Sequence, residues 1–276
     1  MRRCPVCTKT FPNFIPIAEP YVRFQHELNV PYSLEDFETI NLGGYGCPHC
    51  EASDRDRLYA LYVRDHLKWP AGELLRVLDI APGKALARWL RALPDVDYRS
   101  GDLDPELADE QVDICDMPQF EDESFDLIVC SHVLEHVADD RRAMRELCRV
   151  LSPQGRAILM VPIMTTATHT DEDVSITDAN VRWQRFGQGD HVRMYCKADW
   201  LERLQRSGWH VSQYDANSIG PAVFREHGIT ANFMIPDLRR RAKSVIEAQV
   251  KMRTAFYDRN DIPIVRGQAK FLDPHT

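Results

Sequence analysis

The sequence predicts an α/β fold built on a parallel sheet, and three segments in the middle of the chain support that prediction. Residues 76–80 are a short apolar run, a Pro-Gly turn follows, and leucines recur at helical spacing over 85–93. Residues 98–102 form a second run that ends in an acid, and residues 124–132 are typical of a buried parallel strand. Alternation of strands and helices in this way indicates βαβ units.

The turn after the first strand is the first candidate binding site. Glycine at position 83 lets the backbone approach a ligand closely, and the N-terminus of the following helix offers free N–H groups. Such strand-turn-helix units bind nucleotides at the carboxyl end of the strand, which makes Asp79 and Gly83 candidate site residues. Asp102 ends the second strand, where an acid can hold the two hydroxyls of a ribose.

The stretch from about Leu74 to Ile163 resembles the class I S-adenosylmethionine-dependent methyltransferases. The resemblance rests on FEDESFDLIVCSHVLEHVADD, on MRELCRVLSPQG and on AILMVP, which are similar to the fourth-strand and fifth-strand signatures of that family. It implies a Rossmann-like sheet of seven strands with helices on both faces. It also implies S-adenosylmethionine as the methyl donor.

The resemblance assigns cofactor contacts residue by residue. It places Ala81 and Gly83 against the methionine part, Asp102 on the ribose and Asp113 on the adenine amino group. Ile114 packs on the adenine ring, and Ser131 lies beside the cofactor at the end of the fourth strand. The family usually has Gly-x-Gly-x-Gly where this chain has Ala81-Pro82-Gly83-Lys84-Ala85. Because proline stiffens the turn and removes a donor, we expect the tail of the cofactor to be held differently here.

A helix is predicted from Ser53 to about Leu67, because Ser53 and Asp56 form a capping-box pattern ahead of an apolar stripe. In the family a helix at this place covers the cofactor. An arginine of this helix, Arg55 or Arg57, could bind the cofactor carboxylate through a forked pair of hydrogen bonds. We expect Arg57 in that role.

The first fifty residues contain two C-P-x-C motifs, which indicate a structural zinc site. Each motif presents two thiolates about one turn apart, as a tetrahedral zinc ion requires. Four thiolates leave no open position for water, so this site should support structure and not catalysis. The predicted ligands are Cys4, Cys7, Cys47 and Cys50.

The chain divides into three predicted parts: a zinc-binding lobe over 1–52, the methyltransferase domain over 53–236 and a helical extension over 237–276. Within the domain we expect a helix from Asp139 or Asp140 to Leu151, a strand at 156–163, an irregular segment at 164–189, and an edge strand at 231–235. The extension carries an apolar stripe that includes Leu238, beside many cations. That stripe is the expected contact of a homodimer.

Two histidines are candidate general bases. His132 follows the fourth strand, where the acceptor meets the methyl group in the family, and His191 precedes the return of the chain to the sheet. Histidine can take a proton near neutral pH. Glu135 and His136 are expected to have a local packing role.

The composition favours a soluble cytoplasmic enzyme with a small-molecule acceptor. The formal charge of −8 argues against general affinity for nucleic acid. No segment has the length and character of a membrane span. The cysteines fit a reducing compartment.

Three alternatives remain at this point. Zinc-ribbon ribosomal RNA methyltransferases have cysteine motifs ahead of a similar domain, although their cysteines are closer together and a basic surface is expected. A protein that kept the fold and lost catalysis is the second alternative. The third is an enzyme that uses the cofactor for another reaction, since this fold fixes the cofactor better than the chemistry. The main prediction is transfer of a methyl group to an oxygen or nitrogen of a small biosynthetic molecule.

Overall fold

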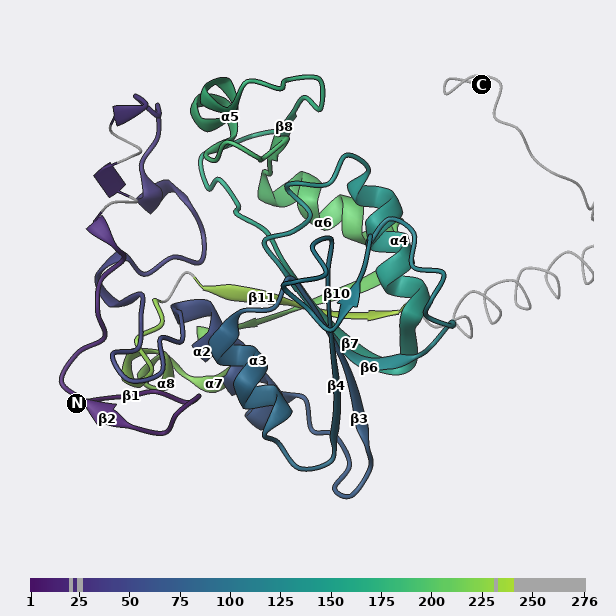
Figure 1. The fold of residues 1–276 in the computed structure, drawn as a ribbon. Helices are drawn as coiled ribbons and strands as arrows, with labels where there is room; N and C mark the ends of the chain where they lie inside the picture. The colour runs from purple at the N-terminus through teal and green to yellow at the C-terminus, as the bar shows by residue number, and fades with distance from the viewer. Residues whose placement is uncertain (20–21, 24–26, 231–232, 241–276) are drawn as a thin grey trace, which may run out of the picture. The chain divides into compact units, whose positions relative to one another are not determined.

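A seven-stranded sheet organises the computed structural model, which describes residues 1–19, 22–23, 27–230 and 233–240 (Figure 1). The order across the sheet is β10 (Trp209–Asp215), β11 (Met234–Arg240), β7 (Leu151–Met160), β6 (Phe125–Ser131), β3 (Leu75–Ile80), β4 (Val96–Asp102) and β5 (Glu110–Gln111). Strands β7 to β5 pair in parallel, whereas β11 is antiparallel to both neighbours. The predicted Rossmann-like sheet is confirmed.

Helices cover both faces of the sheet, because alternate side chains of the central strands are apolar on each side. In β6, Ile128 and Cys130 pack toward α4 (Asp140–Val150) and α6 (Lys197–Arg206). Leu127 and Val129 pack on the other face, which is covered by α2 (Asp54–Leu61), the π-helical turn η3 (Tyr62–His66), α3 (Lys84–Arg91), α7 (Ala216–Ile219) and α8 (Pro221–Glu226) (Figure 1). Within the described part of the chain, every helix is too short or too polar to span a bilayer.

Two predicted helix starts are confirmed by their caps. The Ser53 hydroxyl accepts from the N–H of Asp56 at 3.1 Å, and the Asp56 carboxylate accepts from the N–H of Ser53 at 2.9 Å. Asp139 caps α4 by accepting from the N–H of Arg142 at 2.9 Å. These bonds satisfy donors that have no partner within the helix.

The segment after β7 has more regular structure than its sequence pattern predicts. It contains β8 (Asp171–Glu172), which pairs with β9 (Arg193–Met194), and α5 (Ala179–Phe186). Helix α5 buries only Phe186, so its sequence lacks the apolar periodicity by which a helix is recognised. A capping aspartate, Asp178, starts this helix.

The last strand differs from the prediction in place and length. Strand β11 lies between β7 and β10, so it is not an edge strand, and it continues through Leu238 to Arg240, where a helix was expected. Met234, Ile235 and Leu238 are buried, which a strand inside the sheet requires. Residues 241–276, with the rest of the predicted helix and its dimer contact, lie outside the described residues.

The N-terminal residues form a small lobe of short elements around the cysteines. These elements are β1 (Arg2–Arg3), β2 (Thr10–Phe11), η1 (Leu34–Asp36) and η2 (Leu42–Gly44). Phe14 and Ala52 pack with the cysteines in a small core. Ile15 pairs with Gly46 as an isolated β-bridge, which joins the first half of the lobe to the second cysteine motif.

Candidate functional site

The register of the central strands brings three predicted cofactor residues to one edge of the sheet. Ile80 of β3 lies opposite Gly101 of β4 and Cys130 of β6. The residues that come next along the chain are Ala81, just after β3, and Asp102 and Ser131, the last residues of β4 and β6. Parallel strands therefore deliver them side by side at the carboxyl edge, where ligands of this fold class bind.

The turn at 81–83 is exposed and has an unusual backbone. Ala81 has φ of 51°, a left-handed conformation that favours glycine, and its N–H donates to the carbonyl of Gly101 at 2.8 Å. Gly83 caps α3, and a Cβ atom there would lie 3.4 Å from a carboxylate oxygen of Asp56. The turn thus keeps the shape of a glycine turn although alanine and proline occupy it.

Asp79 lies beneath this turn and is 2% exposed. The Tyr98 hydroxyl donates to its carboxylate at 2.7 Å. Burial raises the pKa of Asp79 to about 7. Asp79 therefore does not face solvent, and its hydrogen-bond partner is Tyr98 of β4.

The predicted adenosine contacts gather beyond β4 and β5. Asp102 is partly exposed, and its carboxylate accepts from the N–H of Asp104 at 3.0 Å. Asp113 is exposed, whereas Ile114 is buried. The N–H of Val112 donates to the carbonyl of Asp102 at 2.8 Å, which ties the two segments together.

The prediction that Arg57 binds the cofactor carboxylate is wrong. Its guanidinium is fully buried and uses all five N–H donors on main-chain carbonyls, those of Gly44, Tyr45, Ala52, His227 and Gly228, at 2.6–3.0 Å. It also lies over the Phe14 ring, 3.7 Å from the centroid. Arg57 therefore has no donor left for a cofactor carboxylate. Its hydrogen bonds join the N-terminal lobe to the region after α8.

Arg55, the other arginine considered for this role, points elsewhere. It lines a cavity of about 680 Å³, donates to the hydroxyl of Tyr45 at 3.2 Å and contacts the Nε2 atom of His132. The two arginines are two positions apart on one helix, so they emerge on different sides of it. The sequence pattern alone does not show which one is buried.

The cavity lies next to the carboxyl edge of the sheet. His132 follows β6 and Pro162 follows β7, and both line it. Most of its remaining wall is apolar and comes from the N-terminal lobe, including Ile15 and Phe37, while Phe186 closes it from α5. Its volume is in the range of sites that enclose small organic molecules.

His132 lines the cavity but has partners on both ring nitrogens. Its Nδ1 atom lies 3.2 Å from a carboxylate oxygen of Glu135, and Arg55 occupies Nε2. Burial and the positive charge of Arg55 lower the pKa of His132 to about 4, so the ring is neutral at pH 7. His132 has φ of 59°, a strained backbone conformation for this residue type.

His191 also lines the cavity and is 6% exposed. Its Nδ1 atom is 3.0 Å from the carbonyl of Phe186, so Nδ1 carries the proton and Nε2 keeps a lone pair. The Nε2 atom is 4.0 Å from Glu135. Burial lowers the pKa of His191.

Glu135 and His136 belong to the same cluster, although only packing was expected of them. Glu135 is fully buried, and the His136 and His191 rings meet edge to face with centroids 4.7 Å apart. One donor atom from each of Glu135, His136 and His191 lies within 4.8 Å of the others. The Glu135–His136 pair can be seen in the sequence, but His191 comes close to it only in the folded chain.

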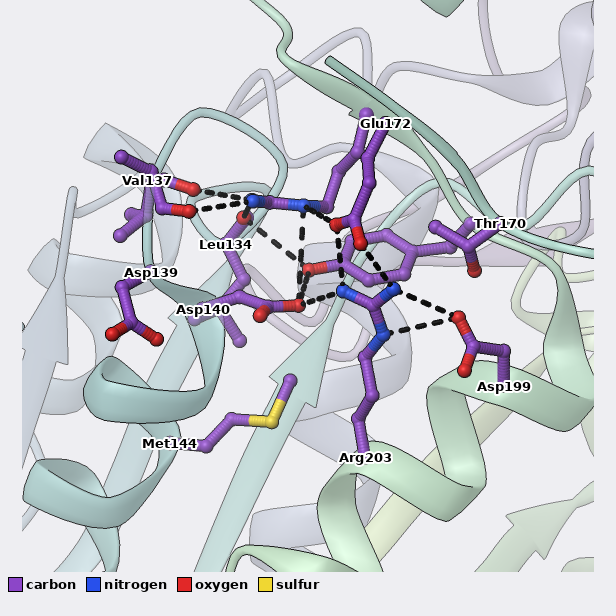
Figure 2. Close-up of polar contacts among 12 residues, drawn as sticks. Leu134, Val137, Asp139, Asp140, Met144, Thr170, Glu172, Asp199 and Arg203 are labelled. Carbon is purple, nitrogen blue, oxygen red and sulfur yellow. Dashed lines mark hydrogen bonds and ion pairs between the residues drawn. The ribbon is translucent and has the colours of Figure 1, made fainter. Parts of the chain in front are cut away.

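A buried ionic network fixes the loop that carries this pair (Figure 2). Arg193 donates to the carbonyls of Leu134 and Ala138 at 2.6 and 3.0 Å and also to Val137. Arg203 donates to Asp140 at 2.8 Å and to both oxygens of Glu172 at 2.9 Å. These hydrogen bonds from Arg203 lower the pKa of Glu172 to about 2. No pattern in the sequence predicts this network.

The four predicted zinc ligands converge. Cys4 Sγ lies 3.7 Å from Cys50 Sγ, Cys7 Sγ lies 3.8 Å from Cys47 Sγ, and all four sulfur atoms are within 4.8 Å of one another. These separations are too long for disulfides. They match the edge of a tetrahedron with zinc–sulfur bonds of about 2.3 Å, which is about 3.8 Å. The donor set therefore fits a tetrahedral thiophilic cation.

Residues 75–159 match the family model described as a methyltransferase domain, and this match covers β3 to β7 and the cofactor edge. This part of the chain is therefore similar to methyltransferase domains, and its strands belong to the Rossmann-like sheet. An uncharacterized methyltransferase of Bacillus subtilis is 32% identical to it over 81 residues, 29% of this chain and 30% of that protein. A soluble pyridine nucleotide transhydrogenase of Marinobacter nauticus is 42% identical over 53 residues, 19% of this chain and 11% of that protein. The chain thus spans a third or less of these relatives.

Several solved structures resemble the methyltransferase domain in fold. The [4+2]-cyclase SpnF is 17% identical, with a TM-score of 0.44 over 85% of this chain and 99% of that one. A methyltransferase from Mesorhizobium loti is 18% identical, with a TM-score of 0.40 over 62% of this chain and 94% of that one. Likeness at this level carries no information about the acceptor.

Proposed function

We propose that this protein transfers the methyl group of S-adenosylmethionine to an oxygen or nitrogen of a small biosynthetic molecule bound in the cavity. The observation that carries the proposal is the position of that cavity. It opens beside His132, the residue that follows Ser131 at the cofactor edge, and its walls are largely apolar. A partly enclosed cavity of about 680 Å³ suits a small molecule better than a nucleic acid strand.

The residues at the cofactor edge fit the proposed methyl donor. Ala81 and Gly83 are exposed, and Asp102 and Asp113 offer carboxylates, whereas Ile114 is buried. The bound cofactor would supply an electrophilic methyl carbon on a sulfonium. The chain has to hold the acceptor nucleophile in line with that carbon and to receive its proton.

His132 and His191 are the proposed proton acceptors. His191 is the better placed of the two, because its Nε2 lone pair is free of hydrogen bonds among the described residues, whereas both nitrogens of His132 have partners. Replacement of each by alanine, and then of both, tests this role. Unchanged turnover in the double variant would exclude both as bases.

We also propose that the four cysteines hold a structural zinc ion. The proposal rests on the sulfur separations, which suit a tetrahedral site. Metal analysis of protein purified without added zinc should find about one zinc per chain. A ratio well below one would contradict it.

Calorimetric titration with S-adenosylmethionine and with S-adenosylhomocysteine tests the cofactor site. Both should bind in the micromolar range, and Asp102→Ala should weaken both. Asp97→Ala is the matched control, because Asp97 lies near the amino end of the same strand, away from the cofactor edge. If neither compound binds, the methyltransferase proposal fails and a non-catalytic role becomes the leading interpretation.

A further inference from the structure

Three side chains with metal-binding atoms meet at the wall of the cavity. Glu135 and His136 follow β6, and His191 lies two residues before β9. One donor atom from each lies within 4.8 Å of the others. The set consists of two imidazoles and one carboxylate, and it contains no sulfur.

The carboxylate of Glu135 needs a partner. It is fully buried; the Nδ1 atom of His132 lies 3.2 Å from its Oε1, whereas its Oε2 accepts no hydrogen bond from any residue that the structure describes. The Nε2 atom of His191 lies 4.0 Å from the same Oε1. A buried carboxylate with one oxygen unpaired is costly, and a bound cation would reduce that cost.

Both histidines are oriented as metal ligands usually are. The Nδ1–H group of His191 donates to the carbonyl of Phe186 at 3.0 Å. The Nδ1 atom of His136 lies 3.4 Å from a carboxylate oxygen of Asp190. Outer partners of this kind hold the proton on Nδ1 and leave the Nε2 lone pair for a cation. The ionic network around Arg193 keeps the Glu135–His136 loop in place (Figure 2).

We propose that Glu135, His136 and His191 form a binding site for a divalent first-row transition metal ion, with its remaining coordination positions open to the cavity. Nitrogen and carboxylate ligands together favour zinc, iron, cobalt or manganese over magnesium, which prefers oxygen ligands. All three ligands line the cavity. An acceptor with a hydroxyl or carboxylate oxygen could complete the coordination of the metal ion. Only this role of the acceptor rests on the proposed function; the metal site itself does not depend on it.

The metal site changes the role of one proposed base. When His191 binds a cation through Nε2, its Nδ1–H group still donates a hydrogen bond to the carbonyl of Phe186. The ring then has no lone pair left to accept a proton. His191 is then a ligand. Metal dependence of turnover distinguishes the two roles, because a base needs no metal.

Cobalt(II) titration of protein that contains one zinc per chain, at the cysteines, tests the site, because cobalt reports its ligands by absorption. We expect one additional cobalt per chain, with a spectrum that lacks thiolate charge-transfer bands. Glu135→Gln, His136→Ala and His191→Ala should each weaken this binding by about tenfold or more. His169→Ala and His210→Ala, which change exposed histidines, should leave it unchanged.

The titration requires no cofactor, acceptor or turnover, so its result is independent of the methyltransferase proposal. Far-UV circular dichroism and urea unfolding of each variant check that it is folded. Absence of stoichiometric cobalt binding to the wild-type protein would overturn the metal site, as would equal affinity in all three variants. A spectrum with thiolate bands would assign the cobalt to the cysteines and would also overturn it. The two readings of the wild-type protein, absence of cobalt binding and thiolate bands, do not depend on any variant being stable.

Discussion

The backbone N–H of Val192 donates a 2.9 Å hydrogen bond to the carbonyl oxygen of Glu135. This bond joins the segment that carries His191 to the loop that carries Glu135 and His136. Arg193, the next residue, continues the connection through three carbonyls of the same loop. The histidine–glutamate cluster is therefore positioned by main-chain contacts from both sides, as a preorganised site requires.

Arg193→Lys tests this arrangement. Lysine keeps the charge but cannot reproduce the fork, so buried carbonyls lose donors, and we expect a loss of about 3 kcal/mol in the free energy of unfolding. Urea unfolding followed by tryptophan fluorescence measures it. Arg206→Lys, at an exposed position, is the control and should change little. Equal stability of both variants would show that the network does not hold the loop.

Arg57→Lys should separate structural support from cofactor binding. Five carbonyls lose their shared donor, so we expect a loss of about 3 kcal/mol or more in stability. The affinity of the folded variant for S-adenosylhomocysteine should stay close to that of the wild type. Arg64→Lys, at a half-exposed position of the following helical turn, is the control. A large loss of affinity at unchanged stability would restore Arg57 as a cofactor residue.

Asp79 should make stability depend on pH. Its carboxyl keeps its proton in the folded protein up to about pH 7, whereas in the unfolded chain it ionises above its ordinary value of 3.8. Unfolding then releases a proton between these values, so this group lowers stability as pH rises from about 4 to 7. Asp79→Asn should gain stability over the wild type across that window, with no difference below it. Urea unfolding of both proteins at a series of pH values measures this, and a pH-independent difference would contradict it.

Ala81→Gly should stabilise the protein by about 1 kcal/mol, because glycine adopts the left-handed conformation of this turn without strain. Ala87→Gly, in the middle of α3, is the control and should destabilise by a similar amount. Thermal unfolding of the two variants compares them. Destabilisation by both substitutions would mean that the turn is not strained.

The sequence predicted the sheet, both major caps and the cysteine site because these depend on local patterns. Strand β6 is a continuous apolar run, and Ser53 and Asp139 stand in front of apolar stripes. It did not predict the place of β11, since the order of strands depends on pairing between distant segments. Arg57 was assigned wrongly because burial is a property of the packed lobe. The cluster at Glu135 was missed because His191 reaches it only through the fold.

Helix α2 starts shortly after Cys50, and it contacts the cofactor turn, the cavity and the N-terminal lobe. Asp56 lies against the Gly83 turn, Arg55 enters the cavity and Arg57 binds the N-terminal lobe. A cation on the cysteines and a cofactor at the turn would thus act on the same helix, and their binding equilibria would be thermodynamically linked. Linkage is reciprocal. If the bound cation changes the affinity for the cofactor by some factor, the bound cofactor changes the affinity for the cation by the same factor.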